Sequence, residues 1–157
     1  MSTKIAVLMG GPSSEREVSL SSGKAMFAAC AALGYDAISL EFENDILSHL
    51  DTLKSVDIVL IALHGGIGEN GRIQGMFESL GIRYTGSDAL SSAICMDKHI
   101  SKLLAEDVGI ATPRWKRIRT GKSIYKNEFD YPFVVKPNSE GSTIGLTIVH
   151  NENDYDS

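Results

Sequence analysis

The sequence has no long hydrophobic run, which limits where the chain can reside. Its unbroken apolar stretches, such as residues 58–63, are far shorter than the roughly 20 residues that a membrane-spanning helix needs. The N-terminus leads at once into a strand-like segment and shows neither a signal-peptide core nor a cleavage motif. The sequence therefore predicts a chain that neither crosses a membrane nor carries a secretory leader.

Cysteine is also scarce, and acidic residues outnumber basic ones. Cys30 and Cys95 are the two cysteines, and both lie in helix-like apolar patterns, which predicts buried free thiols rather than a disulfide or a metal site. These features together favour the reducing cytoplasm. The formal net charge of −5 argues against a nucleic-acid surface. The acidic residues between Asp36 and Asp45 are expected to form a solvated face.

What remains is an alternation of strand-like and helix-like segments. Strands are predicted over residues 4–9, 35–42, 57–63 and 83–85, and helices over residues 18–33, 45–53, 73–80, 89–96 and 98–107. Repeated strand–helix–strand units favour a parallel sheet with right-handed crossovers. In such a sheet the loops after the strands gather at one edge, where ligands bind. The sequence therefore predicts a parallel-sheet, Rossmann-like α/β domain.

The pattern changes at residues 109–113, where Gly-Ile-Ala-Thr-Pro follows the last predicted helix. Proline biases the residue before it away from helix, so we place a domain boundary here, between residues 1–110 and 111–157. In the second part, the strand-like segments 131–136 and 146–149 flank a polar loop that contains glycine. Two strands around such a loop favour a hairpin.

The first loop with candidate chemistry follows the first predicted strand and reads Gly-Gly-Pro-Ser-Ser-Glu-Arg-Glu, residues 10–17. Its glycines allow a sharp turn and a close approach to a ligand. Ser14 and Glu17 have the spacing of a capping box, which explains them as a helix start. Glu15 is explained less well, because any first-turn position gains the same 0.3–1 kcal/mol or so from the helix dipole. Glu15 is therefore a candidate anchor for a substrate ammonium group, with a capping role as the alternative.

The second glycine-rich loop follows the third predicted strand and opens with His64. Three of its glycines fit the dinucleotide fingerprint G-x-G-x-x-G: Gly66, Gly68 and Gly71. A dinucleotide-dependent oxidoreductase is thus one alternative, although the fingerprint normally directly follows the first strand. His64 is a candidate site residue at the ligand edge. Because both loops follow parallel strands, Glu15 and His64 are expected to lie on the same edge of the sheet.

Two lysines occupy positions that a bound phosphate would explain. Lys98 begins a predicted helix, where the dipole disfavours a cation unless an anion lies nearby. Lys136 ends an apolar strand, where an unpaired charge is costly. The loop after Lys136 has glycines and hydroxyl groups, and its backbone N–H groups can wrap phosphate oxygens. A solvated lysine and a polar surface hairpin are the alternative interpretations.

Taken together, these segments resemble the D-alanine–D-alanine ligase family of the ATP-grasp superfamily. The matching runs lie in order over nearly the whole chain: residues 10–20, 62–65 with 68–69, 71–75, 84–87, 96–98, and 136–137 with 140–142. Asn70 stands where the family commonly has aspartate. The resemblance implies a Rossmann-like (pre-ATP-grasp) N-terminal domain followed by the first half of an ATP-grasp α+β domain.

The resemblance also implies a reaction, the ATP-dependent joining of two D-alanines for peptidoglycan biosynthesis. ATP phosphorylates the carboxylate of the first D-alanine, and the amine of the second attacks the acylphosphate. The resemblance further implies that Glu15 binds the ammonium group of the first D-alanine and that His64 lies beside its carboxylate. Ser142 is implied to help fix Glu15 and the substrate.

The nucleotide is implied to be held by Lys98 and Lys136, with Thr143 in the loop that covers the phosphates. Mg²⁺ is implied as well, but the family takes its metal ligands from a further domain, so we expect none in this chain. The chain alone is therefore expected to be inactive. A homodimer formed through the N-terminal domain is implied too. A non-catalytic small-molecule-binding domain derived from a ligase is the other alternative.

Overall fold

The computed structural model describes residues 2–119 and 129–156. The chain forms two compact units, Met1–Cys95 and Met96–Ser157. This division falls before helix α5 (Lys98–Asp107), whereas the sequence pattern placed a domain boundary after that helix. The described residues contain no helix that is long and apolar enough to cross a membrane.

The first unit is built around a three-stranded parallel sheet in the order β2-β1-β3. Its strands are β1 (Lys4–Gly10), β2 (Asp36–Phe42) and β3 (Ile58–Ile61). The parallel sheet expected from the strand–helix alternation is thus confirmed. The predicted strand over residues 83–85 is reduced to an isolated parallel bridge between Tyr84 and Val59.

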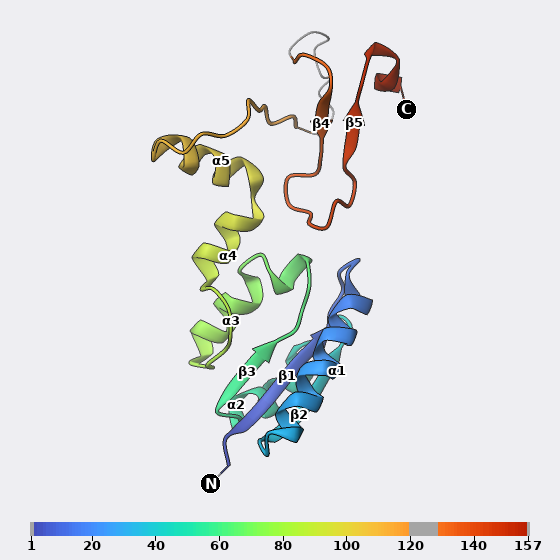
Figure 1. Cartoon of the computed structure of the whole chain (residues 1–157). Coiled ribbons are helices and arrows are strands. Elements are labelled where there is room, and N and C mark those ends of the chain that lie inside the picture. Colours follow the sequence, from blue (N-terminus) through green and yellow to red (C-terminus); the bar gives the residue numbers. More distant parts are fainter. Residues whose placement is uncertain (1, 120–128, 157) are drawn as a thin grey trace. The chain divides into compact units, whose positions relative to one another are not determined.

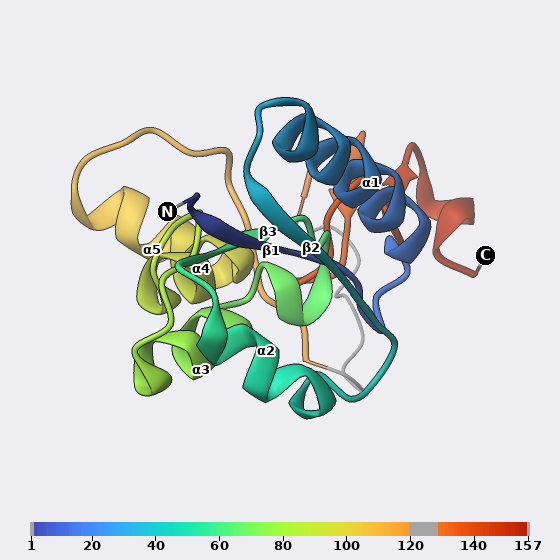
Figure 2. The same cartoon turned by 90° about the horizontal axis from the view of Figure 1, so that it is seen from below.

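Helices cover both faces of this sheet (Figures 1 and 2). They are α1 (Arg16–Ala32), α2 (Leu50–Ser55), preceded by the 3-10 turn η1 (Leu47–His49), and α3 (Arg72–Leu80), preceded by η2 (Gly66–Gly68). Among the described residues, α4 (Ala89–Met96), which follows α3 in the chain, contributes no side chain to either buried cluster. Helix α1 lies against one face, and α2 and α3 lie against the other (Figure 2). The sheet is therefore a central layer. The largely apolar sequences of β1 and β3 are as expected when both faces are covered, whereas β2 also carries the exposed Asp36, Ser39 and Glu41.

Strand β1 divides its side chains between the two cores. Ile5, Val7 and Met9 are buried in the cluster that includes side chains of α1. Ala6 and Leu8 belong to the opposite cluster, with side chains of α2 and α3. Successive residues of a strand point to opposite faces, so the unbroken apolar run of β1 fills two cores at once.

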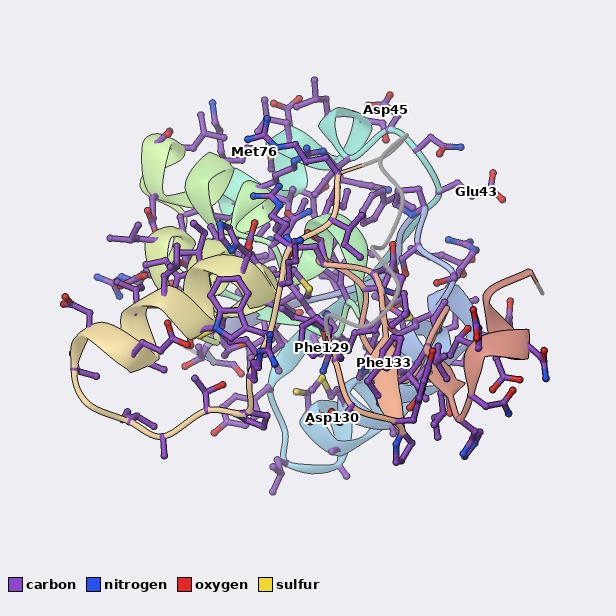
Figure 3. The ribbon with its side chains drawn as sticks, turned by 90° about the horizontal axis from the view of Figure 1, so that it is seen from above. Glu43, Asp45, Met76, Phe129, Asp130 and Phe133 are labelled. Atoms are coloured by element: carbon purple, nitrogen blue, oxygen red, sulfur yellow. The ribbon has the colours of Figure 1, made fainter. Side chains whose placement is uncertain are left out.

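The second unit contains α5 and an antiparallel hairpin of β4 (Phe133–Val135) and β5 (Thr147–Val149), followed by the 3-10 turn η3 (Glu152–Asp156). The predicted hairpin is thus confirmed. Phe133 packs beside Phe129, with ring centroids 5.8 Å apart, and stacks on Tyr131 at 5.6 Å (Figure 3). These aromatic contacts support the first strand of the hairpin.

The two cysteines differ in their surroundings. Cys30 is buried in the cluster beneath α1, as predicted, whereas Cys95 on α4 is exposed, so the prediction of a second buried thiol is wrong. Both are free thiols. The acidic residues from Asp36 to Asp45 are exposed, which confirms the predicted solvated face.

Helix α1 approaches β1 closely at Gly23. A β-carbon built on this buried glycine would lie 2.5 Å from Cβ of Met9. Met9 is itself only 1% exposed and cannot move outward. The missing side chain of Gly23 therefore sets how closely the helix seats on the sheet.

We expect Gly23→Ala to lower the free energy of unfolding by about 1–3 kcal/mol, the usual cost of overpacking a filled core. Gly75→Ala in α3 is the matched control, because its β-carbon would meet Ala89 Cβ at 3.7 Å, an ordinary contact. This control should be neutral or stabilising by up to about 1 kcal/mol, since alanine favours helix over glycine. Urea denaturation followed by circular dichroism measures both, and a stabilising Gly23→Ala would contradict the packing described here.

Candidate functional site

The two glycine-rich loops start side by side at the carboxyl edge of the sheet. Strands β1 and β3 are adjacent and parallel, and the amide of Ala62 continues their pairing by donating to the Leu8 carbonyl at 2.9 Å. The first loop leaves β1 after Gly10, and the second follows β3. The topology thus places Glu15 and His64 in neighbouring loops at one edge.

Ser19 of α1 joins the ends of these two strands. Its Oγ accepts a hydrogen bond from the Gly10 amide and donates one to the Ala62 carbonyl, each at 2.8 Å. The residue is 0% exposed, so neither backbone group has water as an alternative partner. Helix α1 and both loop origins are therefore held in a fixed arrangement.

Arg16 joins the same helix to the carboxyl end of β2. Its Nη1 donates to the Phe42 carbonyl at 2.6 Å and to the Gly11 carbonyl at 3.3 Å. Its Nη2 forms an ion pair with Glu41 at 2.7 Å. The half-exposed ion pair adds little stability. The backbone contacts are what fix the carboxyl end of β2 to the start of α1.

Ser13 connects the two loops directly. Its Oγ donates to the His64 carbonyl at 2.5 Å and accepts from the Glu15 amide at 3.2 Å. A β-carbon on Gly65 would lie 2.6 Å from Glu15 Oε2, and one on Gly66 would lie 3.3 Å from Ser13 Cβ. The first loop therefore rests against the backbone of the second loop at these two glycines.

The Glu15 carboxylate is directed at the second loop and does not cap its own helix. Glu15 occupies the N-cap position of α1, which has no side-chain capping hydrogen bond. The capping box predicted from Ser14 and Glu17 is therefore not formed. The half-buried Glu15 carboxylate lies over the backbone of Gly65, next to His64.

His64 is half-buried and held at two points. Its carbonyl accepts from Ser13, and its ring Nε2 lies 3.0 Å from Ser22 Oγ on α1. A carboxylate and an imidazole thus flank the edge of the sheet, both carried by loops that are fixed to the same helix. This arrangement suits a small ligand that has an ammonium group and a carboxylate.

The glycine fingerprint of the second loop is explained by packing. Added β-carbons would meet Ser13 at Gly66, the Leu63 side chain at Gly68, and the Ala89 carbonyl at Gly71. The protein's own atoms thus fill the space beside all three glycines. No dinucleotide is needed to account for the pattern, which removes the main argument for an oxidoreductase.

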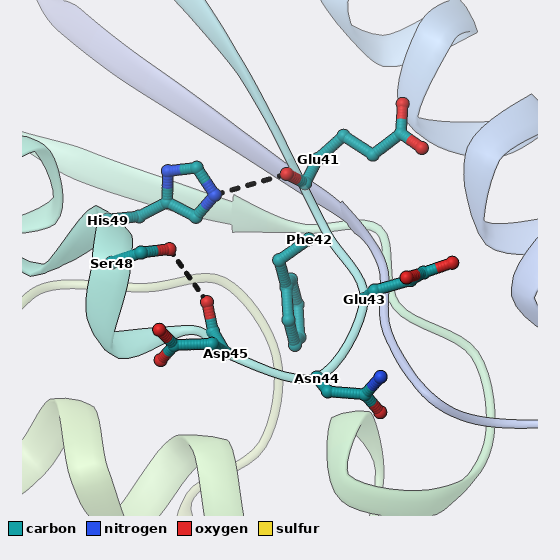
Figure 4. Close-up of a pocket in the computed structure, with 7 residues that line it drawn as sticks. All are labelled: Glu41, Phe42, Glu43, Asn44, Asp45, Ser48 and His49. Atoms are coloured by element: carbon teal, nitrogen blue, oxygen red, sulfur yellow. Dashed lines mark hydrogen bonds between the residues drawn. The ribbon is translucent and has the colours of Figure 1, made fainter.

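A separate open hollow of about 350 Å³ lies at the carboxyl end of β2 (Figure 4). Its lining consists of Glu41, Phe42, Glu43, Asn44, Asp45, Ser48 and His49. His49 Nε2 donates to the Glu41 carbonyl at 3.1 Å, and Ser48 donates to the Asp45 carbonyl at 2.8 Å. Neither Glu15 nor His64 lines this hollow. Its carboxylates form part of the solvated acidic face.

In the second unit, Lys98 and Asn138 connect α5 to the loop after β4. The Lys98 Nζ donates to the carbonyls of Asn138, at 3.3 Å, and of Glu140. The Lys98 amide donates to the same Asn138 carbonyl at 3.1 Å, and the His99 amide donates to Asn138 Oδ1 at 3.0 Å. Asn138 therefore binds the first turn of α5, which is why that helix groups with the hairpin rather than with the first unit.

Asp97 caps α5. Its Oδ1 accepts from the Ile100 amide at 2.9 Å, and this bond, with a second from the Asn138 side chain, holds the pKa of Asp97 below its usual value. Both bonds favour the ionised carboxylate. The cap fixes the backbone from which Lys98 extends.

The remaining predicted site residues lie beyond β4 and are exposed: Lys136, Ser142 and Thr143. Lys136 does follow an apolar strand, but it is exposed, so solvation lowers the cost of its charge. Ser142 and Thr143 have φ values of 48° and 65°, a region that residues other than glycine adopt uncommonly. The loop after β4 thus begins with an exposed lysine and has a left-handed backbone at Ser142 and Thr143.

The described residues, 2–119 and 129–156, contain no group of three or more His, Cys, Asp or Glu side chains able to hold a metal ion. This part of the chain therefore does not fit a magnesium site. The structure brings Glu15 together with His64 in the first unit. In the second unit it joins Lys98 to the loop that carries Lys136, Ser142 and Thr143.

The polar residues that hold the edge in place were not identified from the sequence. Arg16, Ser19 and Ser22 recur every three residues at the start of α1, so they share one face of the helix. That face packs on the sheet edge, where an apolar stripe is usual. The sequence does carry a signal for these residues: polar side chains recur at helical spacing on the side of α1 that faces the core.

Two family models match the chain. The D-ala D-ala ligase N-terminus matches residues 39–87, and the D-ala D-ala ligase C-terminus matches residues 104–157. The D-alanine–D-alanine ligase of Syntrophotalea carbinolica is 48% identical over 149 residues, which cover 95% of this chain and 48% of that protein. The enzyme of Moorella thermoacetica is 44% identical over 162 residues, covering 98% of this chain and 52% of that protein.

Solved structures give the same result. The crystal structure of D-alanine–D-alanine ligase from Bacillus anthracis matches with a TM-score of 0.87 at 42% identity, over 98% of this chain and 51% of that one. The same enzyme complexed with ATP matches with a TM-score of 0.85 at 40% identity, over 98% and 52%. The chain thus spans about half the length of the relatives that it matches.

Removal of the α5 cap should show a specific pH dependence. We expect Asp97→Ala to destabilise the second unit by about 1 kcal/mol at pH 7, the usual value of an N-cap. The pKa of Asp97 is lower in the folded protein than its ordinary value of 3.8, so the ionised carboxylate stabilises the folded state at pH values above 3.8. This stabilisation is lost as the pH falls through the pKa that Asp97 has in the folded state. The difference between wild type and Asp97→Ala should therefore shrink below about pH 3.8.

Asp97→Asn is the matched control, since asparagine caps helices equally well but does not titrate. It should keep most of the stability and lose the pH dependence. Hydrogen exchange of the α5 amides measures the effect locally. A constant difference between wild type and Asp97→Ala from pH 7 to pH 3 would contradict the assigned cap.

Proposed function

Because the chain belongs to the D-alanine–D-alanine ligase family, we propose that it is the N-terminal part of an ATP-dependent D-alanine–D-alanine ligase. Residues 1–110 are proposed as the substrate-binding domain and residues 111–157 as the first half of the nucleotide-binding domain. The observation that carries the proposal is the adjacency of Glu15 and His64 at one sheet edge in a chain 48% identical to such a ligase.

The proposed reaction has two steps. In the first, the γ-phosphate of ATP is transferred to the carboxylate of one D-alanine, which yields an acylphosphate and ADP. In the second, the amine of another D-alanine attacks the acyl carbon, inorganic phosphate leaves, and the amine loses a proton as the peptide bond forms. The product, D-alanyl-D-alanine, is a precursor for the cell wall. Such a reaction needs an anchored amino acid and positive charge around the phosphates.

Glu15 is proposed to bind the ammonium group of the first D-alanine. Its carboxylate is half-buried, lies over Gly65 and makes no capping bond in its own helix, all of which support this role. A carboxylate accepting from an ammonium group forms a charge-assisted hydrogen bond, the stronger kind. His64, the residue before Gly65, is proposed to lie beside the carboxylate of the same D-alanine.

Lys98, Lys136 and Thr143 are proposed to contact the phosphates of ATP, and Ser142 the amino-acid substrate. The Lys98 ammonium lies among loop carbonyls at the start of α5, and lysine suits phosphates as a compact charge. The left-handed backbone at Ser142 and Thr143 supports a loop shaped for a ligand. One structural relative was crystallised with ATP, which supports ATP as the nucleotide.

Mg²⁺ belongs to the proposal only as an ion whose ligands lie outside this chain. ATP chemistry of this kind uses the metal to neutralise developing charge. Since no suitable cluster occurs in the described residues, no step is assigned to the metal here. The reaction is proposed to take place in the cytoplasm, where ATP is supplied and where the two free thiols stay reduced.

The complete ligase is proposed to be a homodimer that pairs through its N-terminal domain. Exposed apolar side chains support this part of the proposal: Leu90 on α4 is 71% exposed, and on α5 Leu103 and Leu104 are 43% and 45% exposed. Large apolar side chains left in water favour association. Sedimentation of the complete ligase at high concentration tests the pairing, and a monomer would contradict it.

Substitution of the proposed anchor tests the substrate assignment. In the complete ligase, Glu15→Gln should raise KM for the first D-alanine about ten- to a hundredfold, since a hydrogen bond to a charged group is worth about 1.5–3 kcal/mol. KM for ATP should change little. Steady-state kinetics with varied D-alanine and with varied ATP separate the two effects.

Glu17→Gln is the matched control, because Glu17 is an exposed carboxylate in the first turn of the same helix. It removes the same charge from the helix start without touching the second loop. Its kinetics should be close to wild type. An equal effect of both substitutions would assign Glu15 to the helix dipole, and an unchanged KM for D-alanine in Glu15→Gln would end the substrate assignment.

The isolated 157-residue chain should not make D-alanyl-D-alanine. Two lysines offset only part of the charge of a triphosphate, and the described residues offer no metal site. We expect no D-alanine-dependent release of phosphate from ATP by the purified chain, and turnover by the complete ligase under the same conditions. Phosphate release by the chain alone that depends on D-alanine would contradict the proposed division of the site.

A further inference from the structure

We propose that Ser22 is a positioning residue that orients the His64 ring and determines which ring nitrogen carries the proton. The Ser22 hydroxyl donates to His64 Nε2, so the neutral ring keeps its proton on Nδ1. The ring then presents an N–H donor to the carboxylate of the bound amino acid. The proposal rests on the proposed function, in which His64 lies beside that carboxylate.

The contact itself is a single hydrogen bond between elements far apart in the sequence. Ser22 Oγ on α1 lies 3.0 Å from Nε2 of His64, which follows β3. Both side chains are half-buried. A serine inside a helix ordinarily bonds the carbonyl one turn back. The Ser22 hydroxyl instead reaches across to the imidazole, so its position is set by the tertiary structure.

The backbone of His64 is already held by other contacts, so the Ser22 hydrogen bond acts on the imidazole ring alone. Ser13 already holds the His64 carbonyl at 2.5 Å, and Ser19 fixes the backbone two residues earlier at Ala62. What remains free is rotation of the imidazole about its side-chain bonds. Ser22 removes that freedom, and it does so from the same helix face that carries Ser19.

The direction proposed for the hydrogen bond follows from the chemistry of the neutral ring together with the carboxylate that the proposed function places beside it. A neutral imidazole has one N–H donor and one acceptor nitrogen, so the partner of one nitrogen decides the role of the other. If Nε2 accepts from Ser22, Nδ1 is the donor and attracts a carboxylate. If Nε2 donates to Ser22, Nδ1 is a lone-pair acceptor and repels one. Only the first arrangement is compatible with a bound carboxylate.

The other surroundings of Ser22 and His64 leave Nδ1 of the ring available to a ligand. Among residues 2–119 and 129–156, the Ser22 hydroxyl and the His64 ring have no other hydrogen-bond partners than each other. The Ser22 proton thus has Nε2 as its protein acceptor, and Nδ1 is the ring nitrogen left for a ligand. Glu15, beside Gly65, supplies the complementary negative charge for the ammonium group of the same molecule.

The tautomer is measured directly by NMR on the ligand-free 157-residue chain with ¹⁵N-labelled histidine. Long-range ¹H–¹⁵N correlations, recorded at a pH where the ring is neutral, show which nitrogen is protonated. His64→Gln identifies the His64 signals among those of the four histidines. We expect the Nδ1–H form in the wild type and a change towards Nε2–H in Ser22→Ala.

Two further variants separate this role from a general effect on the helix. Ser21→Ala makes the same change at an exposed neighbouring position and should leave the His64 signals unchanged. Ser22→Thr keeps the hydroxyl and should restore the Nδ1–H form. An Nε2–H form in the wild type overturns the proposal even if Ser22→Ala fails to fold. An unchanged tautomer in a folded Ser22→Ala overturns it as well.

These outcomes are measured without a ligand, so they do not depend on substrate binding or activity. In the complete ligase, Ser22→Ala should raise KM for D-alanine about fivefold, the value of one neutral hydrogen bond, with KM for ATP unchanged. If the tautomer changes but KM for D-alanine does not, the donor role of His64 towards the carboxylate fails, and with it that part of the proposal. If Glu15→Gln also leaves KM unchanged, the proposed function itself fails.

Discussion

The buried hydroxyl of Ser19 is the contact on which the carboxyl edge of the sheet depends. It bonds the Gly10 amide and the Ala62 carbonyl, so one side chain of α1 fixes the points from which both glycine-rich loops start. A buried backbone group left without a partner costs about 1–3 kcal/mol, and loss of this hydroxyl would leave two. Arg16 and Ser22 extend the same polar face of α1 to β2 and to the His64 ring.

The two loops then determine each other's shape. Ser13 and Glu15 lie against the backbone of the second loop at Gly66 and Gly65, where an added β-carbon would come within 3.3 Å of Ser13 Cβ and 2.6 Å of Glu15 Oε2. The left-handed φ of Gly65, 65°, serves the same close approach. The glycines that resemble a nucleotide fingerprint are therefore packing glycines here, and the Glu15 carboxylate, which lies over the neighbouring Gly65, is the candidate substrate anchor. In the second unit, Asn138 plays a comparable part by holding the first turn of α5 to the loop after β4.

Much of the fold could be predicted because hydrophobic periodicity is a local signal. The repeated strand–helix units indicated parallel pairing, as found. A prediction that required knowledge of the surroundings failed, because Cys95 lies in an apolar helical pattern but faces solvent. Lys136 likewise follows an apolar strand but is exposed. Periodicity reports which side of an element is apolar, but not whether another element covers it.

The sequence by itself determined the family, the order of the strands and helices, and the two loops that carry Glu15 and His64, because motif spacing and strand direction are properties of the chain. Only the tertiary structure decided how those side chains are held. The Glu15 carboxylate could cap its helix or face the second loop, and the contact with Gly65 selects the latter. The His64 ring acquires its partner from α1, 42 residues away in the sequence. Hydrogen bonds between distant segments have no local pattern, since they form only when the sheet brings those segments together.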